Sequence, residues 1–410
     1  MQLPRWLTCG VFGIVFAAVL AGASGAAADV VTDANAKAAE IVSKHPATPI
    51  GVRMMAVIQV SVFEAVNAVT GRYPASRAKL ERAPDASVDA AVAAAARTAL
   101  LKVFPAQQAA IEAEYQAALK GIADGPAKTS GIAVGERAAT AIVALCADDG
   151  FNAADTYRPA VAAGVYAPTT LPAVPHWGKR RPWVMSRGDQ FRPGPPPALT
   201  SETWTRDYNE IKAIGGKGNT VRTPEQTAIA KFWEATLPVV YWPVARSVAS
   251  VPGRDVTDNA RLLAVAAMAM DDALIAVFDA KYTYNFWRPI TAIRNGHDGN
   301  DATTREVGWT PFIDTPMHPE YPCAHCIVSA SLGAVLAAEL GNGPAPQLSS
   351  SSYTAGGAVR TWVTVDEFVR EVAVARIYDG VHYRFSTDVG SAMGKQIGEL
   401  AAASFPKPTR

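Results

Sequence analysis

Cysteine is scarce in this sequence. The 410 residues include four cysteines, at positions 9, 146, 323 and 326, which are too few for a fold held together by several disulfides. An excess of either charge is also missing, because 38 lysines and arginines face 37 aspartates and glutamates. Nucleic-acid-binding and polybasic membrane-binding surfaces need clustered positive charge, so we expect neither kind of partner.

The first 28 residues have the pattern of a secretory signal peptide. Arg5 is their only charge, an apolar run extends from Val11 to Leu20, and Ala26–Ala28 precede Asp29. The apolar run is shorter than the ~20 residues of a membrane-spanning helix, and no later uninterrupted run reaches that length. We therefore expect cleavage near Ala28–Asp29, secretion or a periplasmic location, and no stable membrane insertion. The mature chain would keep three cysteines, so at least one thiol is free or pairs with another molecule.

Apolar residues recur at steps of three and four along most of the chain, which predicts helices. No stretch has the sustained alternation of a strand, and no internal repeat is evident. The sequence therefore predicts an all-α fold, built as two packed helical bundles in one unit. The expected helices are Ala34–Ser43, Gly51–Val69, Asp85–Phe104, Ala106–Ala123, Thr129–Asp148, Glu202–Ile214, Thr223–Thr236, Thr257 to about Arg294, Cys323–Glu339, Val365–Tyr378 and Ser386–Ser404.

A long segment between these helices is irregular. Nine prolines lie between Asp149 and Thr200, and the helical periodicity stops there. Such a segment inside a compact domain is usually a functional cover or a linker. Because Trp177 and Trp183 need burial, we expect it to wrap over the helices, with its charged side chains in solvent. The expected organisation is one domain over 29–410, with N-terminal helices in 29–150, a proline-rich wrapping segment in 151–222, and a helical part in 223–410 that carries the binding site.

The stretch Glu320-Tyr-Pro-Cys-Ala-His-Cys-Ile327 joins a proline-containing loop to an apolar helix. The first N–H groups of a helix lack internal acceptors, and together with the helix dipole they favour an anion. His325 stands in that first turn. Other cations and a second histidine occur in two further stretches, as Lys281, Arg288, Arg376 and His382. Together these residues predict an oxyanion site.

The sequence spacing of these cations and histidines indicates which side chains share a helix face. Lys281 and Arg288 are seven residues apart, two helical turns, so they share a face if the helix continues to Pro289. Arg376 and His382 are six apart, and a straight helix would place them on different sides. Gly380 can end the helix in a left-handed turn and return His382 towards Arg376.

The same residues resemble a known motif set. Lys-x6-Arg-Pro, Pro-Ser-Gly-His and Ser-Arg-x5-His mark the vanadium-dependent haloperoxidases, the type 2 phosphatidic acid phosphatases and the bacterial acid phosphatases. This sequence is similar in the stretches that begin at Lys281, Pro322 and Ala375. Further stretches resemble the exported bacterial haloperoxidases, namely Phe63–Asn67, Arg222–Gln226, Phe286–Arg294, His318–Tyr321 and Gly380–Phe385. The resemblance covers most of the mature chain.

The resemblance implies vanadate as the cofactor, with phosphate able to occupy the same site. His382 would ligate the vanadium, and His325 would be the acid/base group. The implied reaction uses hydrogen peroxide to oxidise bromide, chloride or a small organic acceptor, with hypohalous acid as the product from halide. A homo-oligomer is left open. The residues implied to bind vanadate or phosphate are Lys281, Arg288, Cys323, Ala324 and Arg376.

The second motif departs from the family pattern at two positions, and Ala375 replaces the serine of the third motif. In the second motif Cys323 and Ala324 replace the serine and glycine; a thiol is a poorer donor than a hydroxyl, and alanine restricts the backbone. A thiol beside an oxidant can also form a sulfenic acid or bridge to Cys326. The phosphatases often carry an aspartate four residues after the last histidine, where this chain has Ser386.

Other functions stay open at this point. A soluble phosphatase of the same superfamily would use His382 as the nucleophile. A thiol redox protein would use Cys323 and Cys326, although the expected βαβ context is absent. A relative that binds the anion without catalysis is a third alternative. We interpret the remaining polar candidates as surface or turn residues: His45, His297, His318, and the Asp298, Asn300 and Asp301 group, which lacks a full calcium-loop pattern.

Overall fold

The computed structural model describes residues 29–45, 47–74, 76–236 and 239–405. These residues form thirteen α-helices and one two-stranded sheet, which confirms the predicted all-α class. The predicted leader, residues 1–28, lies outside the described residues, so export stays a prediction. The helices are α1 Val30–Val42, α2 Thr48–Thr70, α3 Val88–Val103, α4 Gln108–Lys120, α5 Pro126–Leu145, α6 Glu202–Ile214, α7 Pro224–Trp233, α8 Trp242–Ala249, α9 Val256–Tyr284, α10 Pro289–Asn295, α11 Ala324–Leu340, α12 Val365–Tyr378 and α13 Arg384–Ser404.

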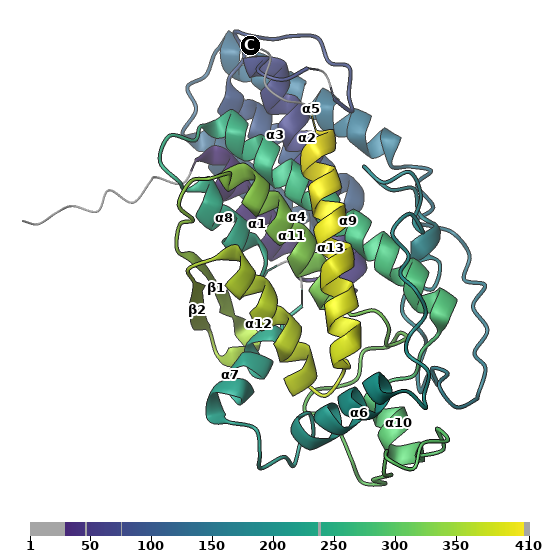
Figure 1. Cartoon of the computed structure of the whole chain (residues 1–410). Coiled ribbons are helices and arrows are strands. Elements are labelled where there is room, and N and C mark those ends of the chain that lie inside the picture. The colour runs from purple at the N-terminus through teal and green to yellow at the C-terminus, as the bar shows by residue number, and fades with distance from the viewer. Residues whose placement is uncertain (1–28, 46, 75, 237–238, 406–410) are drawn as a thin grey trace, which may run out of the picture.

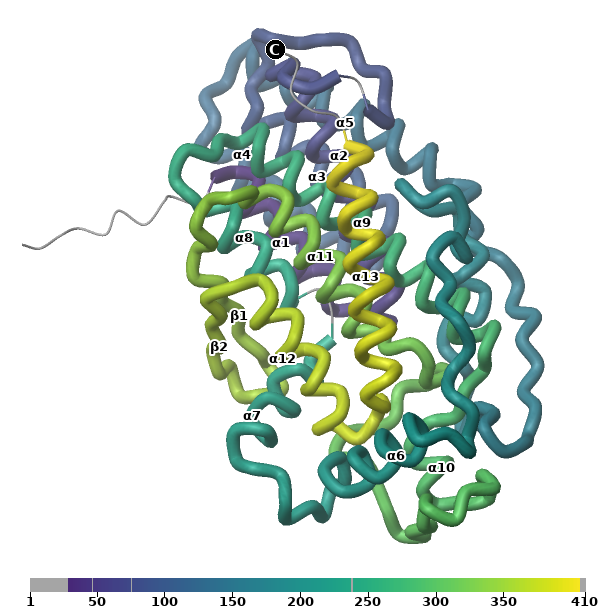
Figure 2. The backbone as a smooth tube through the Cα atoms, in the orientation of Figure 1, coloured from purple at the N-terminus to yellow at the C-terminus, as the bar shows by residue number. Residues whose placement is uncertain are grey.

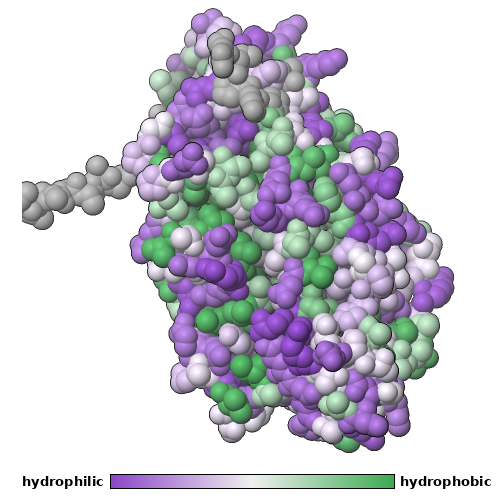
Figure 3. Space-filling model, viewed as in Figure 1, coloured by the Kyte–Doolittle hydropathy of each residue, from purple (hydrophilic) through white to green (hydrophobic). Residues whose placement is uncertain are grey.

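Two helix groups meet along α2 and α9. In the first group α2 packs on α3 and α5, and in the second α11 packs on α13, α12 and α9 (Figures 1 and 2). Within the described part of the chain, α2 alone is long and apolar enough to cross a membrane, and nearly all of it is buried. It is thus a core helix of this fold. On the face in view in Figure 3, hydrophilic and hydrophobic residues are interspersed.

The helix predicted from Thr257 to about Arg294 is two helices. Helix α9 ends at Tyr284 because Asn285 adopts a left-handed conformation, φ 50°, which asparagine tolerates better than most residues. The chain then runs extended, and Pro289 takes the first position of α10, where a missing N–H costs nothing. The prediction that Lys281 and Arg288 share one helical face is therefore wrong.

A β-hairpin and helix α8 were not predicted. Strands β1 (Leu348–Ser352) and β2 (Ala358–Trp362) pair antiparallel, with Leu348 opposite Trp362. In β1 the inward residues include serines, and the Ser350 hydroxyl donates to the Val240 carbonyl at 2.8 Å. The polarity alternation that identifies a strand is therefore absent from this sequence, because serine occupies both faces.

The proline-rich segment buries its tryptophans, as expected. Trp177 is fully buried and Trp183 nearly so. Arg180 is also buried, which corrects the expectation that the charged residues of the segment are solvated. Its guanidinium pairs with Asp149 and with Asp271 of α9, both at 2.8 Å. A buried arginine needs such partners, and here they attach the segment to the helices.

A second acid of α9 holds the backbone of the segment. The Asp272 carboxylate accepts hydrogen bonds from the N–H groups of Trp183, Val184 and Met185, at 2.7, 2.9 and 2.9 Å. An irregular buried backbone has no ladder partners of its own, so a side chain has to satisfy it. The carboxylates of α9 thus supply hydrogen-bond acceptors that a regular helix or strand would provide within the segment.

Candidate functional site

The start of α11 has the geometry that an anion requires. Cys323 is the N-cap, and its Sγ accepts from the Cys326 N–H at 3.2 Å. Ala324 and His325 follow as the first two helical residues, so their N–H groups have no acceptor within the helix. These two N–H groups and the helix dipole make the position favourable for negative charge.

Lys281 lies in the last turn of α9 and is completely buried. Its Nζ donates to the carbonyls of Pro319 and Glu320, at 2.9 and 2.7 Å. Burial lowers the pKa of this lysine well below its ordinary value, and the charge of Arg288 lowers it further. The lysine therefore holds the loop before α11 against α9.

Arg288, the N-cap of α10, connects two loops. Its Nε donates to the His318 carbonyl at 2.8 Å and its Nη1 to the Val381 carbonyl at 2.9 Å. The same Nη1 lies 3.3 Å from His382 Nε2. Burial lowers the pKa of Arg288 to about 10, so the side chain stays charged at neutral pH. The structure thus brings Arg288 and His382 together, although not by the predicted helical face.

Arg376 and His382 meet through the turn at the end of α12. Gly380 has φ 77°, and the N–H groups of Val381 and His382 both donate to the Arg376 carbonyl at 3.3 Å. This is the left-handed turn expected at Gly380 from the six-residue spacing of Arg376 and His382. The Arg376 Nη1 donates to the Trp233 carbonyl at 2.7 Å, while its buried Nε has no protein partner. That Nε is a donor left for a ligand.

Replacing Gly380 with alanine should destabilise the protein by at least about 2 kcal/mol, because a left-handed non-glycine residue is strained and the new Cβ would lie 2.2 Å from the Gly215 carbonyl. Chemical denaturation measures this loss. Gly356 is the matched control, because it has φ 64° and open space around its Cβ position, so Gly356→Ala carries the backbone strain alone. Equal losses in the two variants would contradict the close approach at Gly380.

His382 is oriented by a residue to which sequence reasoning gave no role. Its Nδ1 lies 2.8 Å from Glu320 Oε1, and the Tyr383 N–H donates to the same oxygen at 3.1 Å. Burial lowers the pKa of His382 well below its ordinary value, as do Arg288 and Lys281, so the ring is neutral. A neutral ring that donates from Nδ1 to the carboxylate has its lone pair on Nε2, the ligating atom.

Glu320 itself is an unusual carboxyl group. It is fully buried, and burial raises its pKa to about 7 against the opposing charges of Lys281 and Arg288. The residue lies within the similar stretch His318–Tyr321, but nothing in the sequence marked it as the partner of a histidine 62 positions away. Only the folded chain makes that pairing visible.

His318 was interpreted as a turn residue and instead contacts the site. Its Nδ1 lies 2.9 Å from Arg288 Nη2, and its ring packs edge-on against Phe278 at 5.2 Å. Burial, with the charges of Lys281 and Arg288, lowers the pKa of His318 well below its ordinary value. A neutral His318 can accept from the guanidinium, so it fixes the plane of Arg288. The interpretation of His318 as a residue without a site role is wrong.

His325 stands in the first turn of α11, as predicted, and is half-buried. Burial and the charge of Arg376 lower its pKa well below the ordinary value, while a hydrogen bond with the Ala235 backbone opposes this. Its Nε2 has no protein partner. A neutral imidazole with one free nitrogen can accept or return a proton, the role that the resemblance implies.

Cys323 is not a thiol in this structure. It forms a disulfide with Cys326, and both residues are fully buried. The bonded sulfur has no S–H to donate, so position 323 offers an oxyanion no side-chain donor. Ala324 contributes only its backbone N–H there. Cys146 is the remaining cysteine of the described chain and is a free buried thiol.

These residues fit vanadate or phosphate. Lys281, Arg288 and Arg376 are buried, as are the acids Glu320 and Asp379, and burial raises the pKa of each of these carboxyl groups to about 7. Carboxyl groups that are partly protonated near neutral pH leave part of the arginine charge uncompensated. Unpartnered polar atoms on Arg376 and His325 add hydrogen-bonding capacity. Such a donor set binds a tetrahedral oxyanion.

Asp379 gives the site a testable pH dependence. It pairs with Arg376 at 2.7 Å, yet burial raises its pKa from 3.8 to about 7. As pH rises above about 4, the Asp379 carboxyl group deprotonates first in the unfolded chain. The unfolding free energy of the anion-free protein should therefore fall by up to ~1.4 kcal/mol per pH unit until pH 7. Other acids also titrate, so the measurement is the unfolding free energy of wild type minus that of Asp379→Asn. A difference that stays constant from pH 4 to 8 would contradict this assignment.

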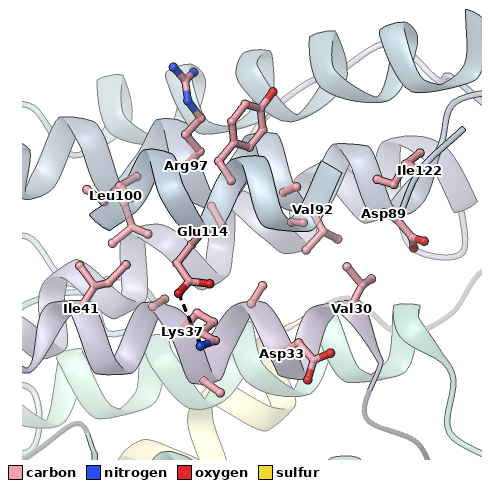
Figure 4. Close-up of a pocket in the computed structure, with 18 of the residues that line it drawn as sticks. Val30, Asp33, Lys37, Ile41, Asp89, Val92, Arg97, Leu100, Glu114 and Ile122 are labelled. Carbon is pink, nitrogen blue, oxygen red and sulfur yellow. Dashed lines mark ion pairs between the residues drawn. The ribbon is translucent and has the colours of Figure 1, made fainter. Parts of the chain in front are cut away.

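A separate cavity of about 650 Å³ lies among α1, α3 and α4 (Figure 4). Its walls are mostly aliphatic, and Lys37 and Glu114 form an ion pair across it at 3.5 Å. None of the oxyanion-site residues lines it. The cavity is therefore distinct from the candidate site.

Comparison with known proteins finds similarity to vanadium haloperoxidases. Residues 261–409 match the VCPO second helical-bundle domain, and that range contains Lys281, Arg288, His325, Arg376 and His382. Vanadium chloroperoxidase of Curvularia inaequalis is 26% identical over 182 residues, which are 37% of this chain. The matched part covers 30% of that relative's length.

Two solved structures share the fold over nearly the whole chain. A bacterial vanadium-dependent iodoperoxidase is similar with a TM-score of 0.77 and 23% identity, covering 91% of this chain and 95% of its own. A holo-type bacterial vanadium-dependent chloroperoxidase has a TM-score of 0.72 and 17% identity, covering 87% and 91%. Residues 261–409 thus match a helical-bundle domain of the vanadium chloroperoxidases, and the fold that the chain shares with the two solved structures extends well beyond that range.

Proposed function

We propose that this protein is a vanadate-dependent haloperoxidase that uses hydrogen peroxide to oxidise bromide or chloride to hypohalous acid. The observation that carries the proposal is the state of His382. Its ring is neutral, its Nδ1 is held by Glu320, and its Nε2 lies 3.3 Å from Arg288 in a buried cationic region. A ligating imidazole needs this tautomer and this support.

The residues have separate tasks in the proposed reaction. Lys281, Arg288 and Arg376 would hold the oxygens of vanadate, and His382 Nε2 would be its protein ligand. Bound vanadate supplies a Lewis acid that polarises peroxide without itself changing oxidation state. His325, with its free Nε2, accepts and returns the proton of the peroxide.

One observation favours a second candidate, a soluble phosphatase. The phosphatase pattern often supports its nucleophilic histidine with an aspartate four residues later, where this chain has Ser386. Here Glu320 supplies a carboxylate to His382 Nδ1 from another loop, while Ser386 Oγ lies further away, at 3.4 Å. A neutral histidine so oriented is also equipped to attack phosphorus.

One experiment separates the two functions. The purified mature chain is stripped of oxyanions and divided, and one portion is reconstituted with vanadate. Halogenation of a small phenolic acceptor is then measured with peroxide and bromide or chloride, and hydrolysis of a phosphate monoester is measured in both portions. The proposal expects halogenation only with vanadate. Ester hydrolysis that vanadate inhibits, without halogenation under any condition, would establish the phosphatase instead.

A further inference from the structure

The Cys323–Cys326 disulfide lies within the candidate oxyanion site. Cys323 is the N-cap of α11, directly after the loop whose carbonyls bind Lys281. Its N–H donates to the Ser386 carbonyl at 3.2 Å, one turn after His382. The sulfur chemistry of this pair therefore takes place beside the residues proposed to bind vanadate.

Helix α13 keeps the two cysteines within reach of each other. A Cβ at Gly390 would lie 2.7 Å from the Cys323 carbonyl oxygen and 3.3 Å from Cys326 Cβ, so α13 presses directly on this turn. The helical hydrogen bond from the Ile327 N–H to the Cys323 carbonyl, 3.2 Å, fixes the turn from the other side. Backbone contacts of this kind do not depend on the S–S bond, so the cysteines stay adjacent after reduction.

The redox state of the pair changes the charge available to an anion. In the disulfide form the two sulfur atoms carry no charge. The dipole of α11 can then attract an anionic ligand. A reduced Cys323 would be a thiol at the N-terminus of α11, directly after the loop whose carbonyls accept from Lys281, and a helix N-terminus favours a thiolate. A thiolate and an oxyanion would then compete for the same positive region.

We propose that Cys323 and Cys326 form a redox switch, closed by peroxide, in which the disulfide form binds the oxyanion and the dithiol form binds it more weakly. The inference rests on the proposed function, because that function supplies both the oxyanion and the peroxide. It assigns the pair a regulatory role within the same site.

One molecule of hydrogen peroxide suffices to oxidise the two thiols to the disulfide. The Cys323 thiolate attacks one peroxide oxygen, the O–O bond breaks, and hydroxide leaves as water after protonation. The Cys326 thiolate then attacks the sulfenic sulfur of Cys323, the S–O bond breaks, and the second water leaves. Two thiols thereby lose two electrons in total and form one disulfide, while hydrogen peroxide becomes two waters.

Opening the switch requires a small dithiol. Both cysteines are fully buried, whereas the neighbouring Ala324 and His325 are partly exposed. A small reductant can enter beside these residues, but a protein thiol cannot. The reductant supplies two electrons and two protons and becomes a disulfide. A bound oxyanion should block this route.

The first arm of the test measures phosphate binding by calorimetry. The full mature chain carries Cys146→Ser to remove the unrelated thiol, and it is titrated before and after reduction with dithiothreitol. We expect reduction to weaken phosphate binding by about tenfold or more, since like charges in one site are unfavourable. In the Cys323→Ser/Cys326→Ser variant, dithiothreitol should leave phosphate affinity unchanged.

The second arm uses the reciprocity of linked equilibria. If the disulfide form binds phosphate ten times more tightly, saturating phosphate must lower the midpoint potential of the pair by about 30 mV. Thiol trapping and mass spectrometry across a series of dithiol redox buffers measure that midpoint. Peroxide added to the reduced protein should restore the disulfide, whereas Cys326→Ser should instead accumulate the sulfinic acid at Cys323.

Two failures can be told apart. Equal phosphate affinity in both redox states, with an unchanged midpoint, overturns the switch and leaves the proposed function standing. Absence of phosphate and vanadate binding in both states overturns the anion site, and the switch falls with it. Peroxide that drives wild-type Cys323 to the sulfinic acid, without restoring the disulfide, overturns the closing step.

Discussion

Replacing His382 by alanine should abolish vanadate-dependent halide oxidation and weaken vanadate binding by more than about a hundredfold. The Nε2 atom is the proposed protein ligand of vanadium, and losing a charge-assisted partner in a buried site costs roughly 3 kcal/mol or more. Phosphate makes no such bond, so its affinity should fall much less. Equilibrium titration with both anions measures the two effects on one variant.

The comparison between the two anions makes the His382 result specific. A variant that merely misfolds would lose both anions together, and circular dichroism would reveal it. His297→Ala is the matched control, because His297 is exposed and belongs to a turn away from the oxyanion site. Vanadate affinity that survives in His382→Ala would show that this histidine is not the ligand.

Replacing Glu320 by glutamine should lower vanadate affinity and halide oxidation by about ten- to a hundredfold, the usual cost of losing a partner behind a metal-ligating histidine. Glutamine keeps the shape of the side chain and removes its charge. The amide can also donate to His382 Nδ1, which would move the ring proton to Nε2 and block ligation. Vanadate titration and the halogenation rate measure the loss.

A pH profile separates this positioning role from a packing role. The pKa of Glu320 is raised to about 7, so in wild type the carboxylate that supports His382 is lost as pH falls below 7. Vanadate affinity should therefore fall on acidification in wild type and change less in Glu320→Gln. Ser386→Ala should have little effect, because its 3.4 Å contact with His382 is a weak hydrogen bond. Parallel pH profiles in wild type and Glu320→Gln would contradict the role given to Glu320.

The cations of the site were predictable, while their carboxylate partners were not. Lysine, arginine and histidine at fixed spacings form a pattern along the chain. Glu320 becomes recognisable as the partner of His382 only when segments distant in sequence meet, and a buried acid and a solvated acid look alike in sequence. His318 was missed for the same reason, since its contacts with Arg288 and Phe278 come from other elements.

The sequence predicted that Arg288 and His382 lie in one site, but not the backbone path that brings them together. Arg288 reaches His382 through the left-handed turn at Asn285 and an extended link, whereas periodicity predicted one continuous helix. Local preference for helix and the proline position were compatible with both paths. Tertiary packing decided between them, as in the Val165–Phe286 bridge that holds the extended link in place.

Helix α9 has a consequence for how this protein can vary. Asp271 and Asp272 bind the proline-rich segment, and Lys281 binds the loop before α11, ten residues or about 15 Å along the same rigid rod. Exposed residues of that segment that contact neither α9 nor the link at Phe286 can vary in sequence with little effect on the site. Arg180, which pairs directly with Asp271, has no such freedom, because its loss would leave a buried carboxylate without its arginine partner.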